Sequence, residues 1–507
     1  MRPTTLLSVV EPAPAKVQPQ VSTRTRFCWG VGGFADWMIY GGVNGLVDPI
    51  YNMAMGIDPR VIGLARSIPR LADIFIDPMI GHLSDNTRSR WGRRRPWMLA
   101  GALMAALIAM FMWHVPTSLG TGVADAFVVT MMVLLFTFGY SLFTIPYIGM
   151  GYGLTTDYNE RTHLFKWRQY AYAAAGFLTP WLPWMCVKLD IVLGGVAPEK
   201  ASGLYGIRYV GILVGIVILL AAFAPIFCCN EGRLAPGEDS KVPFLSAMRF
   251  TLKNGAFWPL VAGNFLLKFG MVSTGIFFIY LLIYNVSGGD KQAGTGQWGI
   301  FCNVINVATF VAMAPIAWVT DKIGKKMTIL LLMAVSAGAY ASVWFTFQPQ
   351  TTIWVVEVAS WLTHWTGIPS FISKAWPVYV TAACVGIFCN CMPMILNSMV
   401  ADVCDLDELN SGHQRQAFYG AIFVTCDKIA MGVAMLLQGF LLAASGFDPE
   451  VAVQKAGTIG FWLKALLLSQ PTGFIFGFLI MLIYPITSAK AREVRAQLEG
   501  RKVCISR

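Results

Sequence analysis

Residues 70–99 read RLADIFIDPMIGHLSDNTRSRWGRRRPWML and join two apolar segments through a short basic turn. A related turn, AWVTDKIGKKMTILL, stands at residues 317–331. Both run from a small residue to an aspartate, then to a glycine, a basic cluster and a new apolar stretch. The two copies fall at the same place in two successive groups of six apolar segments. The sequence therefore predicts two parallel six-helix repeats.

The composition of the 507-residue chain places most of it in lipid. Charged residues make up 13% of the chain, about half the share that is usual in soluble domains. Hydrophobic residues make up 56%, and the mean hydropathy is +0.59, so a soluble fold would have too few charges to cover its apolar surface. The net charge of +11 comes from short basic runs between apolar segments, which indicates membrane topology rather than binding to nucleic acid.

Twelve segments are apolar over the length of about 20 residues that a helix needs to cross a bilayer. They are residues 27–51, 60–84, 96–115, 124–153, 165–187, 208–229, 256–286, 297–319, 327–347, 376–403, 416–445 and 458–487. We therefore expect an all-α membrane protein with twelve transmembrane helices in two six-helix pseudo-repeats.

The polar stretches between these segments divide the chain. We expect a disordered cytoplasmic tail over 1–26, a six-helix bundle over 27–229, a central cytoplasmic loop over 230–255, a second bundle over 256–487 and a basic cytoplasmic tail over 488–507.

Segment 351–372 is ambiguous because its tryptophans are accompanied by Glu357 and His364. As a thirteenth span it would place the basic C-terminal tail outside the cell, whereas basic residues gather on the cytoplasmic side. We therefore interpret it as an interfacial helix within an outer-loop insertion over 348–375, and we place both termini in the cytoplasm.

Charged side chains inside a membrane span are costly and usually functional. The second span carries Arg66, Arg70, Asp73 and Asp77 at spacings that place them on one helical stripe. Asp73 and Asp77 are one turn apart, and lipid disfavours two neighbouring charged carboxylates, so a proton, Na⁺ or an arginine occupies the site. Ser141 could add a hydroxyl ligand. The alternative is a buried ion-pair cluster that only packs helices.

Other spans hold further ionisable residues. Asp36 lies inside the first span without a local partner and is expected to face a water-filled cavity. Asp48 stands at the outer end of that span, where solvent can hydrate it. Arg168 begins the fifth span and Lys428 lies near the middle of the eleventh, with interfacial anchoring and partial exposure as their alternative roles. Lys268 is the weakest candidate, because a long side chain can snorkel.

The two basic turns suggest a gate at the cytoplasmic ends of the helices. Its candidate residues are Asp85, Arg93, Arg94, Asp321 and Lys325. Charge pairs among such residues can hold one half of the bundle against the other, and their rupture would accompany opening toward the cytoplasm. A plain positive-inside anchor is the alternative.

The sequence offers little for catalysis or metal binding. Its 11 cysteines and 5 histidines include no facing CxxC pairs and no HExxH motif, and several cysteines lie in or beside apolar runs. We find no nucleophile constellation of a membrane-embedded enzyme. We therefore expect no metal site, no cofactor and no enzymatic activity.

The 70–99 stretch carries the patterns D-x-x-x-D-P-x-x-G and S-R-x-G-R-x-x-P-W. It resembles the glycoside–pentoside–hexuronide:cation symporter family of the major facilitator superfamily, in its melibiose permease-like branch. Other stretches agree and cover both halves: YSLFTIPY (140–147), DYNERTHLFKWRQ (157–169), MVADVCDLDE (399–408) and CDKIAMG (426–432). The resemblance implies a cation site at Asp73 and Asp77, and a sugar site that uses Asp36, Arg168 and Lys428. We add Tyr140 and Thr144 as candidate substrate-binding residues.

Three positions depart from the family pattern. Thr144 stands where melibiose permease has a sugar-binding aspartate, Ile76 where it has an asparagine beside the second acid, and Ala35 where it has a lysine. These departures put galactoside specificity and the use of Na⁺ in question. Nearby aromatic side chains could stack on a pyranose face or serve only as packing; they are Trp37, Tyr40, Tyr140, Tyr147 and Trp167.

These observations predict a secondary active transporter of the plasma membrane, or of the inner membrane in a Gram-negative cell. We expect symport of a sugar or glycoside with a monovalent cation by alternating access, by a monomer in the lipid bilayer that binds no nucleic acid. H⁺ is the expected coupling ion because a proton needs one carboxylate, whereas Na⁺ needs several oxygen ligands and Ile76 offers none. A lysolipid symporter on the same fold is the alternative, and a sensor without flux is a further one.

Overall fold

A computed structural model gives the structure of most of the chain. The described residues are 21–114, 122–154, 158–229, 254–349, 363–364, 375–411, 416–449, 451 and 453–505. Every regular element among them is a helix. The predicted tail up to residue 20, and almost all of the predicted central loop and interfacial helix, lie outside the described residues.

The N-terminal half contains the first six spans. The first is built from α1 (Thr23–Trp37), η1 (Met38–Val43), α2 (Asn44–Asp48) and η2 (Pro49–Ala54), of which η1 and η2 are π-turns. The others are α3 (Pro59–Asn86), α4 (Arg95–Phe111), α5 (Gly122–Gly153), α6 (Tyr158–Leu178) continued by η3 (Thr179–Trp181) and α7 (Leu182–Val192), and α8 (Gly206–Cys228).

The C-terminal half repeats this plan. Its spans are α10 (Phe257–Thr274) with α11 (Phe277–Leu281) and η5 (Leu282–Val286), α12 (Lys291–Ile323), α13 (Lys325–Ala341) with α14 (Val343–Thr346), α17 (Trp376–Cys384) with η6 (Val385–Cys389) and α18 (Met392–Ser411), α19 (Gln416–Ala444), and α20 (Ala456–Leu482).

The predicted spans are helical, but they are not alike. Within the described residues, 8 helices are long and apolar enough to cross a membrane on length and composition. The other four predicted spans are the first, second, third and fifth; α3 carries the charged stripe, and α4 has 17 residues. The described chain thus has the twelve-span, two-half architecture that the repeated turn predicted.

One predicted boundary is wrong, because α1 begins at Thr23 and the expected tail boundary at residue 26 falls inside its first turn. The Ser22 hydroxyl accepts a hydrogen bond from the backbone N–H of Thr25 (3.2 Å), so Ser22 caps a helix that starts before the apolar segment does. The predicted basic tail contains a further helix, α21 (Ser488–Ile505).

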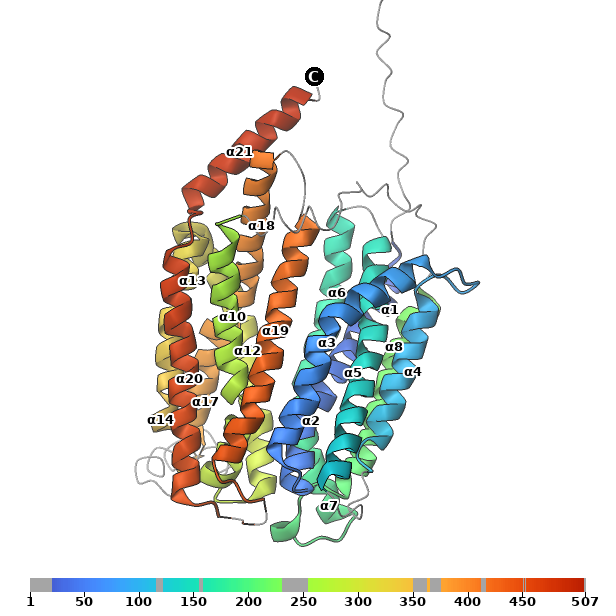
Figure 1. The fold of residues 1–507 in the computed structure, drawn as a ribbon, viewed down its shortest axis with the longest axis vertical. Helices are drawn as coiled ribbons and strands as arrows, with labels where there is room; N and C mark the ends of the chain where they lie inside the picture. The colour runs from blue at the N-terminus through green and yellow to red at the C-terminus, as the bar shows by residue number, and fades with distance from the viewer. Residues whose placement is uncertain are drawn as a thin grey trace, which may run out of the picture.

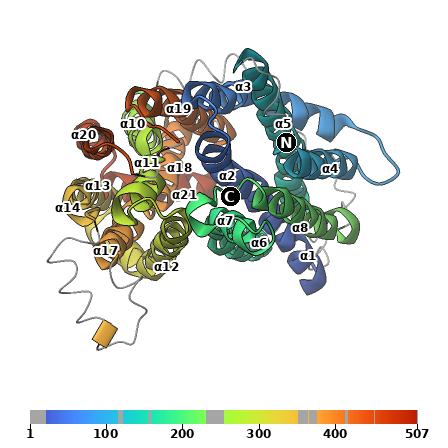
Figure 2. The same cartoon turned by 90° about the horizontal axis from the view of Figure 1, so that it is seen from below.

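The two halves lie side by side (Figure 1). Between them, α3 packs against α19, and α12 packs against the span formed by α6, η3 and α7 (Figure 2). The end of the bundle that carries α21 is called the tail end here, and the opposite end is called the far end.

Helices α3 and α19 approach through their backbones near the far end. A Cβ atom added to Gly439 would lie 2.4 Å from the carbonyl oxygen of Pro59 and 3.0 Å from the Cα atom of Gly63, so the approach requires glycine. At the same end the Tyr280 hydroxyl donates a hydrogen bond to Asn52 Oδ1 (2.5 Å), which links the first span to the seventh. The bundle is therefore closed between its halves along this edge of the far end.

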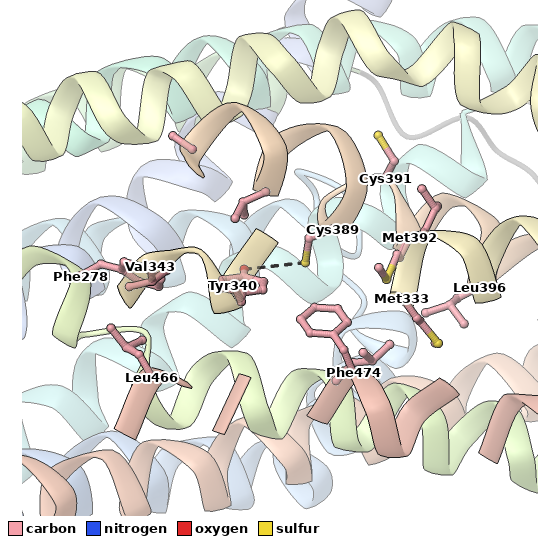
Figure 3. Packing of buried hydrophobic residues seen from close by; sticks show 14 of the residues in the cluster. Phe278, Met333, Tyr340, Val343, Cys389, Cys391, Met392, Leu396, Leu466 and Phe474 are labelled. Carbon is pink, nitrogen blue, oxygen red and sulfur yellow. Dashed lines mark hydrogen bonds between the residues drawn. The ribbon is translucent and has the colours of Figure 1, made fainter. Parts of the chain in front are cut away.

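Each half has its own apolar core. Figure 3 shows part of the C-terminal core, where Tyr340 and Phe474 stack with ring centroids 5.4 Å apart and the Tyr340 hydroxyl lies 3.9 Å from Cys389 Sγ. In the N-terminal core Trp29 stacks on Tyr147 at 5.1 Å. Two separate cores allow each half to move as one unit during a conformational change.

Candidate functional site

Three residues that the sequence predicted as sugar ligands meet at one carboxylate. Asp36 on α1 is 2% exposed and accepts a hydrogen bond from Thr144 Oγ1 of α5 (2.7 Å) and another from Arg168 Nη2 of α6 (2.7 Å). Because the arginine bond is charge-assisted, it is stronger and more directional than a neutral one. Helices from three spans of the N-terminal half are therefore fixed around Asp36.

Aromatic rings surround Arg168. Its guanidinium carbon lies 5.5 Å from the ring centroid of Tyr172 and 5.9 Å from that of Tyr147. Such contacts favour a guanidinium that is withdrawn from water. Its Nε atom is buried and has no hydrogen-bond partner among the described residues, so one donor of this site is unused in this structure.

Asp73 and Asp77 form a second cluster, in which side chains of the protein balance their charges. Asp73 is buried and accepts hydrogen bonds from Arg70 Nη1 (3.2 Å) and from Ser141 Oγ of α5 (3.3 Å). Asp77 pairs with the Lys428 ammonium, whose Nζ also lies 3.6 Å from Asp73 Oδ2. The predicted acid pair with its serine is thus assembled, and two cationic side chains occupy it.

Lys428 lies in the acid cluster and not beside Asp36 and Arg168, where the resemblance had placed it. The sequence alone does not determine which face of α19 meets α3. Because Lys428 belongs to the C-terminal half and both acids belong to the N-terminal half, this cluster joins the two halves inside the membrane.

Tyr140 lies next to Ser141 on α5 and contacts the acid cluster through Arg70. The Arg70 guanidinium carbon is 5.8 Å from the Tyr140 ring centroid, and the rings of Tyr140 and Tyr40 are also 5.8 Å apart. Tyr140, a candidate for substrate binding, therefore lies beside the acid cluster.

Asp48 pairs with Arg66, so the prediction that solvent hydrates Asp48 is wrong. Both side chains are largely buried, at 15% and 12% exposure. Arg66 therefore forms its ion pair with Asp48 of α2 and does not balance the negative charge of Asp73 and Asp77. The π-turns of the first span rotate the residues that follow them, which a regular helical periodicity does not include.

Each basic turn forms an ion pair at the tail end. In the first turn Arg94 Nη2 lies 2.6 Å from Asp85 Oδ1, and Arg94 Nη1 donates to the carbonyl oxygen of Gly149 on α5 (2.6 Å). In the second turn Lys325 Nζ donates to both carboxylate oxygens of Asp402 on α18 (2.7 and 2.6 Å). We call these two groups the tail-end latches.

Each tail-end latch joins residues of a single half, one latch in each half. In this structure the latches therefore do not hold the halves together, contrary to the prediction for them. One joins α4 to α5 and the other joins α13 to α18, which are equivalent helix pairs in the repeat. Asp321 is exposed and lines a polar pocket with Lys325 and Arg492, and Arg93 lies in the turn between α3 and α4.

The membrane interior of the C-terminal half carries fewer charges. Asp427 accepts a hydrogen bond from Asn264 Nδ2 of α10 (3.1 Å). Lys268, one turn after Asn264, forms no ion pair with a described residue. Sequence reasoning missed Asn264 and Asp402, although Asp402 belongs to a stretch that carried the resemblance. The position of Asp402 in the second repeat could have identified it as the partner of Lys325 from the sequence.

The first cluster offers hydrogen-bond donors and acceptors to a polar solute, and the second holds two carboxylates beside two cationic side chains. No group of three or more His, Cys, Asp or Glu side chains in the described part of the chain could hold a metal ion. The site combines hydrogen-bond donors, acceptors and aromatic faces, which suits reversible binding.

Known proteins resemble the chain along most of its length. Residues 28–488 match the family described as MFS/sugar transport protein. The inner membrane symporter YicJ of Escherichia coli is 24% identical, over 96% of this chain and 96% of its own. The isoprimeverose transporter of Lactiplantibacillus pentosus is 22% identical over 86% and 83%. The mouse sodium-dependent lysophosphatidylcholine symporter 1 is 22% identical over 98% and 93%.

Among solved structures, a D-xylose-proton symporter aligns with a TM-score of 0.56, covering 91% of this chain and 97% of its own at 14% identity, which supports the fold. The family match includes both halves and every residue of the two charge clusters. The chain is a membrane transporter and not an enzyme, and it belongs to the glycoside–pentoside–hexuronide:cation symporter family of the major facilitator superfamily.

Proposed function

We propose that the protein couples the uptake of a sugar or glycoside to a cation by alternating access. The observation that carries the proposal is the presence of two buried charge clusters, Asp36 with Arg168 and the Asp73–Asp77–Lys428 group. Ionisable groups inside a membrane are rare outside ion and solute pathways. The names of the YicJ and isoprimeverose relatives support symport and a carbohydrate solute.

The first cluster suits a polyhydroxylated solute. Asp36 offers acceptors and Arg168 offers donors, and the hydroxyl of Thr144 can do both. Sugar hydroxyls can replace the internal hydrogen bonds of this trio. The rings around Arg168 would cover the apolar face of a pyranose.

We propose H⁺ as the coupling ion. Both oxygens of Asp73 already accept hydrogen bonds from protein donors, and Asp77 holds Lys428, so few oxygens remain to surround Na⁺. Asp77 Oδ1 has no hydrogen-bond partner among the described residues and could carry the proton. Protonation would remove the charge that holds Lys428 and would loosen the contact between the halves.

We also propose that the tail end faces the cytoplasm of a monomeric protein in the plasma membrane, or in the inner membrane of a Gram-negative cell. Support comes from the basic turns and the basic helix α21, since positive residues favour the cytoplasmic side. In this orientation both termini are cytoplasmic, and the closed far end faces outward.

The test is transport by purified protein in vesicles. A glycoside library that includes isoprimeverose is first screened for thermal stabilisation, with and without Na⁺, and uptake of the best stabiliser is then measured under imposed ion gradients. We expect accumulation driven by an inward H⁺ gradient and abolished by a protonophore, with Asp36→Asn as the inactive control.

Two results would contradict this proposal separately. Uptake driven by Na⁺ at fixed pH, and unaffected by a protonophore at clamped voltage, would replace H⁺ with Na⁺. Failure of every glycoside to stabilise the protein or to accumulate would remove the sugar assignment.

A second candidate is transport of a lysolipid. In a groove of ≈ 630 Å³ between α10, α19 and α20, leucine and phenylalanine supply seven of the fifteen lining residues, and Lys464 is among the polar ones. Such a groove could take an acyl chain, and the mouse relative is named for a lysophospholipid. Uptake of lysophosphatidylcholine in the same vesicles, with no uptake of glycosides, would favour this candidate.

A further inference from the structure

A continuous row of aromatic side chains connects the two charge clusters. At one end, the Arg70 guanidinium carbon lies 4.7 Å from the ring centroid of Tyr40. The ring centroids of Tyr40 and Trp37 are 5.9 Å apart, and those of Trp37 and Tyr172 are 4.6 Å apart. At the other end, the Tyr172 ring lies 5.5 Å from the Arg168 guanidinium carbon.

Both ends of the row are tied to acids. Arg70 donates a hydrogen bond to Asp73 in the ion cluster (3.2 Å), and Arg168 donates to Asp36 in the solute cluster (2.7 Å). The row therefore begins at one cluster and ends at the other, with cationic groups stacked on aromatic faces at both ends.

The local backbone holds the middle of the row in place. Tyr40 lies in the π-turn Met38–Val43, and π-turns inside α-helices are frequent at functional sites. The Trp37 indole lies flat over Gly41, where a Cβ atom would be 2.7 Å from the ring carbon Cε2. The indole N–H donates a hydrogen bond to Thr179 Oγ1 (3.1 Å).

Neutralising Asp73 would change what holds Arg70. In the present structure the guanidinium is shared between the carboxylate and the faces of Tyr40 and Tyr140. When protonation of Asp77 releases Lys428, whose Nζ already lies 3.6 Å from Asp73 Oδ2, Lys428 can neutralise Asp73 in place of Arg70. The balance for Arg70 then moves toward the rings, because cation–π attraction remains. In a close-packed interior, a displaced ring must displace its neighbours.

We propose that Tyr40 and Trp37 are positioning residues that transmit ion binding at the acid pair to the Asp36–Arg168 solute site. This inference rests on the proposed function, because it takes one cluster as the ion site and the other as the solute site. Typical couplings between two such sites change affinity by about 5- to 150-fold.

The first test uses ions alone as probes. Full-length protein in detergent is titrated with H⁺ and with Na⁺ while tryptophan emission is followed, and subtraction of the Trp37→Phe signal isolates Trp37 from the 17 tryptophans. We expect a Trp37 response to the ion that disappears in Tyr40→Leu. It should persist in Tyr209→Leu, the same change at an exposed tyrosine of α8.

A Trp37 response that survives Tyr40→Leu, or no Trp37 response at all, would overturn the inference. Thermal unfolding of each variant reports whether Tyr40 matters only for stability. A purely structural role would lower the melting temperature and leave the ion response of Trp37 in place.

The second test measures isoprimeverose affinity at saturating and at low ion concentration. For wild type, and likewise for Tyr209→Leu, the isoprimeverose affinity should change by at least about 5-fold between the two ion concentrations. Tyr40→Leu should keep its affinity in one condition and lose the change between the two. A full difference in Tyr40→Leu would contradict the inference. If no variant binds isoprimeverose while the Trp37 response behaves as expected, the aromatic connection stands and the assignment of this solute fails.

Discussion

Each half of the bundle has its own tail-end latch, but the two halves differ in the middle of the membrane. Arg94 and Lys325 each form a latch from the basic cluster that follows the glycine of the repeated turn. In the membrane interior, the N-terminal half places Asp36 against Arg168, whereas in the C-terminal half Asp427 has a neutral partner. The tail-end ion pairs follow the repeat, whereas the ionisable side chains of the membrane interior are concentrated in the N-terminal half of the described chain.

The largest effect is expected for Arg168→Ala. Removing one partner of the buried Arg168–Asp36 pair should cost about 2–5 kcal/mol of binding free energy, which lowers affinity by roughly 30- to 4,000-fold. Glycoside binding and vesicle uptake, with protein amount as the control, measure it. If Arg168→Ala binds the glycoside as tightly as wild type, the charged groups of the N-terminal half do not bind the solute, and the contrast between the halves has no bearing on binding.

The next effect concerns coupling and not binding. Asp77→Asn resembles a permanently protonated acid, so Lys428 loses its main partner whether or not an ion is present. We expect solute exchange at equal concentrations to persist, and accumulation against a gradient to be lost. Counterflow and gradient-driven uptake in the same vesicles separate the two. Retained accumulation would show that Asp77 does not carry the coupling ion.

The tail-end latches should differ in their contribution to stability. The Asp402 side chain is 5% exposed and that of Asp85 is 51% exposed. Asp402→Ala leaves Lys325 without its buried partner and should lower the free energy of unfolding by about 3 kcal/mol. Asp85→Ala should lower it by less than about 1 kcal/mol, because the pair is near solvent. Denaturant unfolding in detergent compares them, and equal losses would show that burial does not distinguish the latches.

The smallest effect is expected for Asp427→Asn. The amide keeps an acceptor oxygen for Asn264 and removes only the charge, so uptake should change by less than about threefold. Initial uptake rates measured beside Arg168→Ala provide the scale. If Asp427→Asn lowers the uptake rate as much as Arg168→Ala does, the C-terminal half contains a second binding cluster, and the two halves do not differ in the way described above.

The sequence was a good guide where a single helix or a motif determines the outcome. The charged stripe on α3 and the repeated turns follow from spacing, and the meeting of Asp36 with Arg168 was implied by the family resemblance. Partners on other helices were harder, because the location of Lys428 and the pairing of Lys325 with Asp402 depend on how helices turn toward one another.

The first span shows a second reason why sequence reasoning failed. Asp48 follows the π-turn η1 and meets Arg66 of α3, whereas its position at the outer end of the span suggested exposure to solvent. The aromatic row was equally hidden. Trp37 and Tyr40 were recognisable as aromatic candidates, but their contacts with Arg70 and Tyr172 appear only in three dimensions.

The glycine contact at the far end bears on how efficiently an ion gradient can be used. Where Gly63 and Gly439 meet, backbone lies against backbone, and the space that side chains would otherwise leave for a file of water molecules is filled. Protons cross membranes along such files. On the coupling proposed above, an ion released from the acid pair would meet a barrier at this edge, which would limit leakage without solute. Two missing side chains would thereby raise the amount of solute that a cell gains for each ion that it admits.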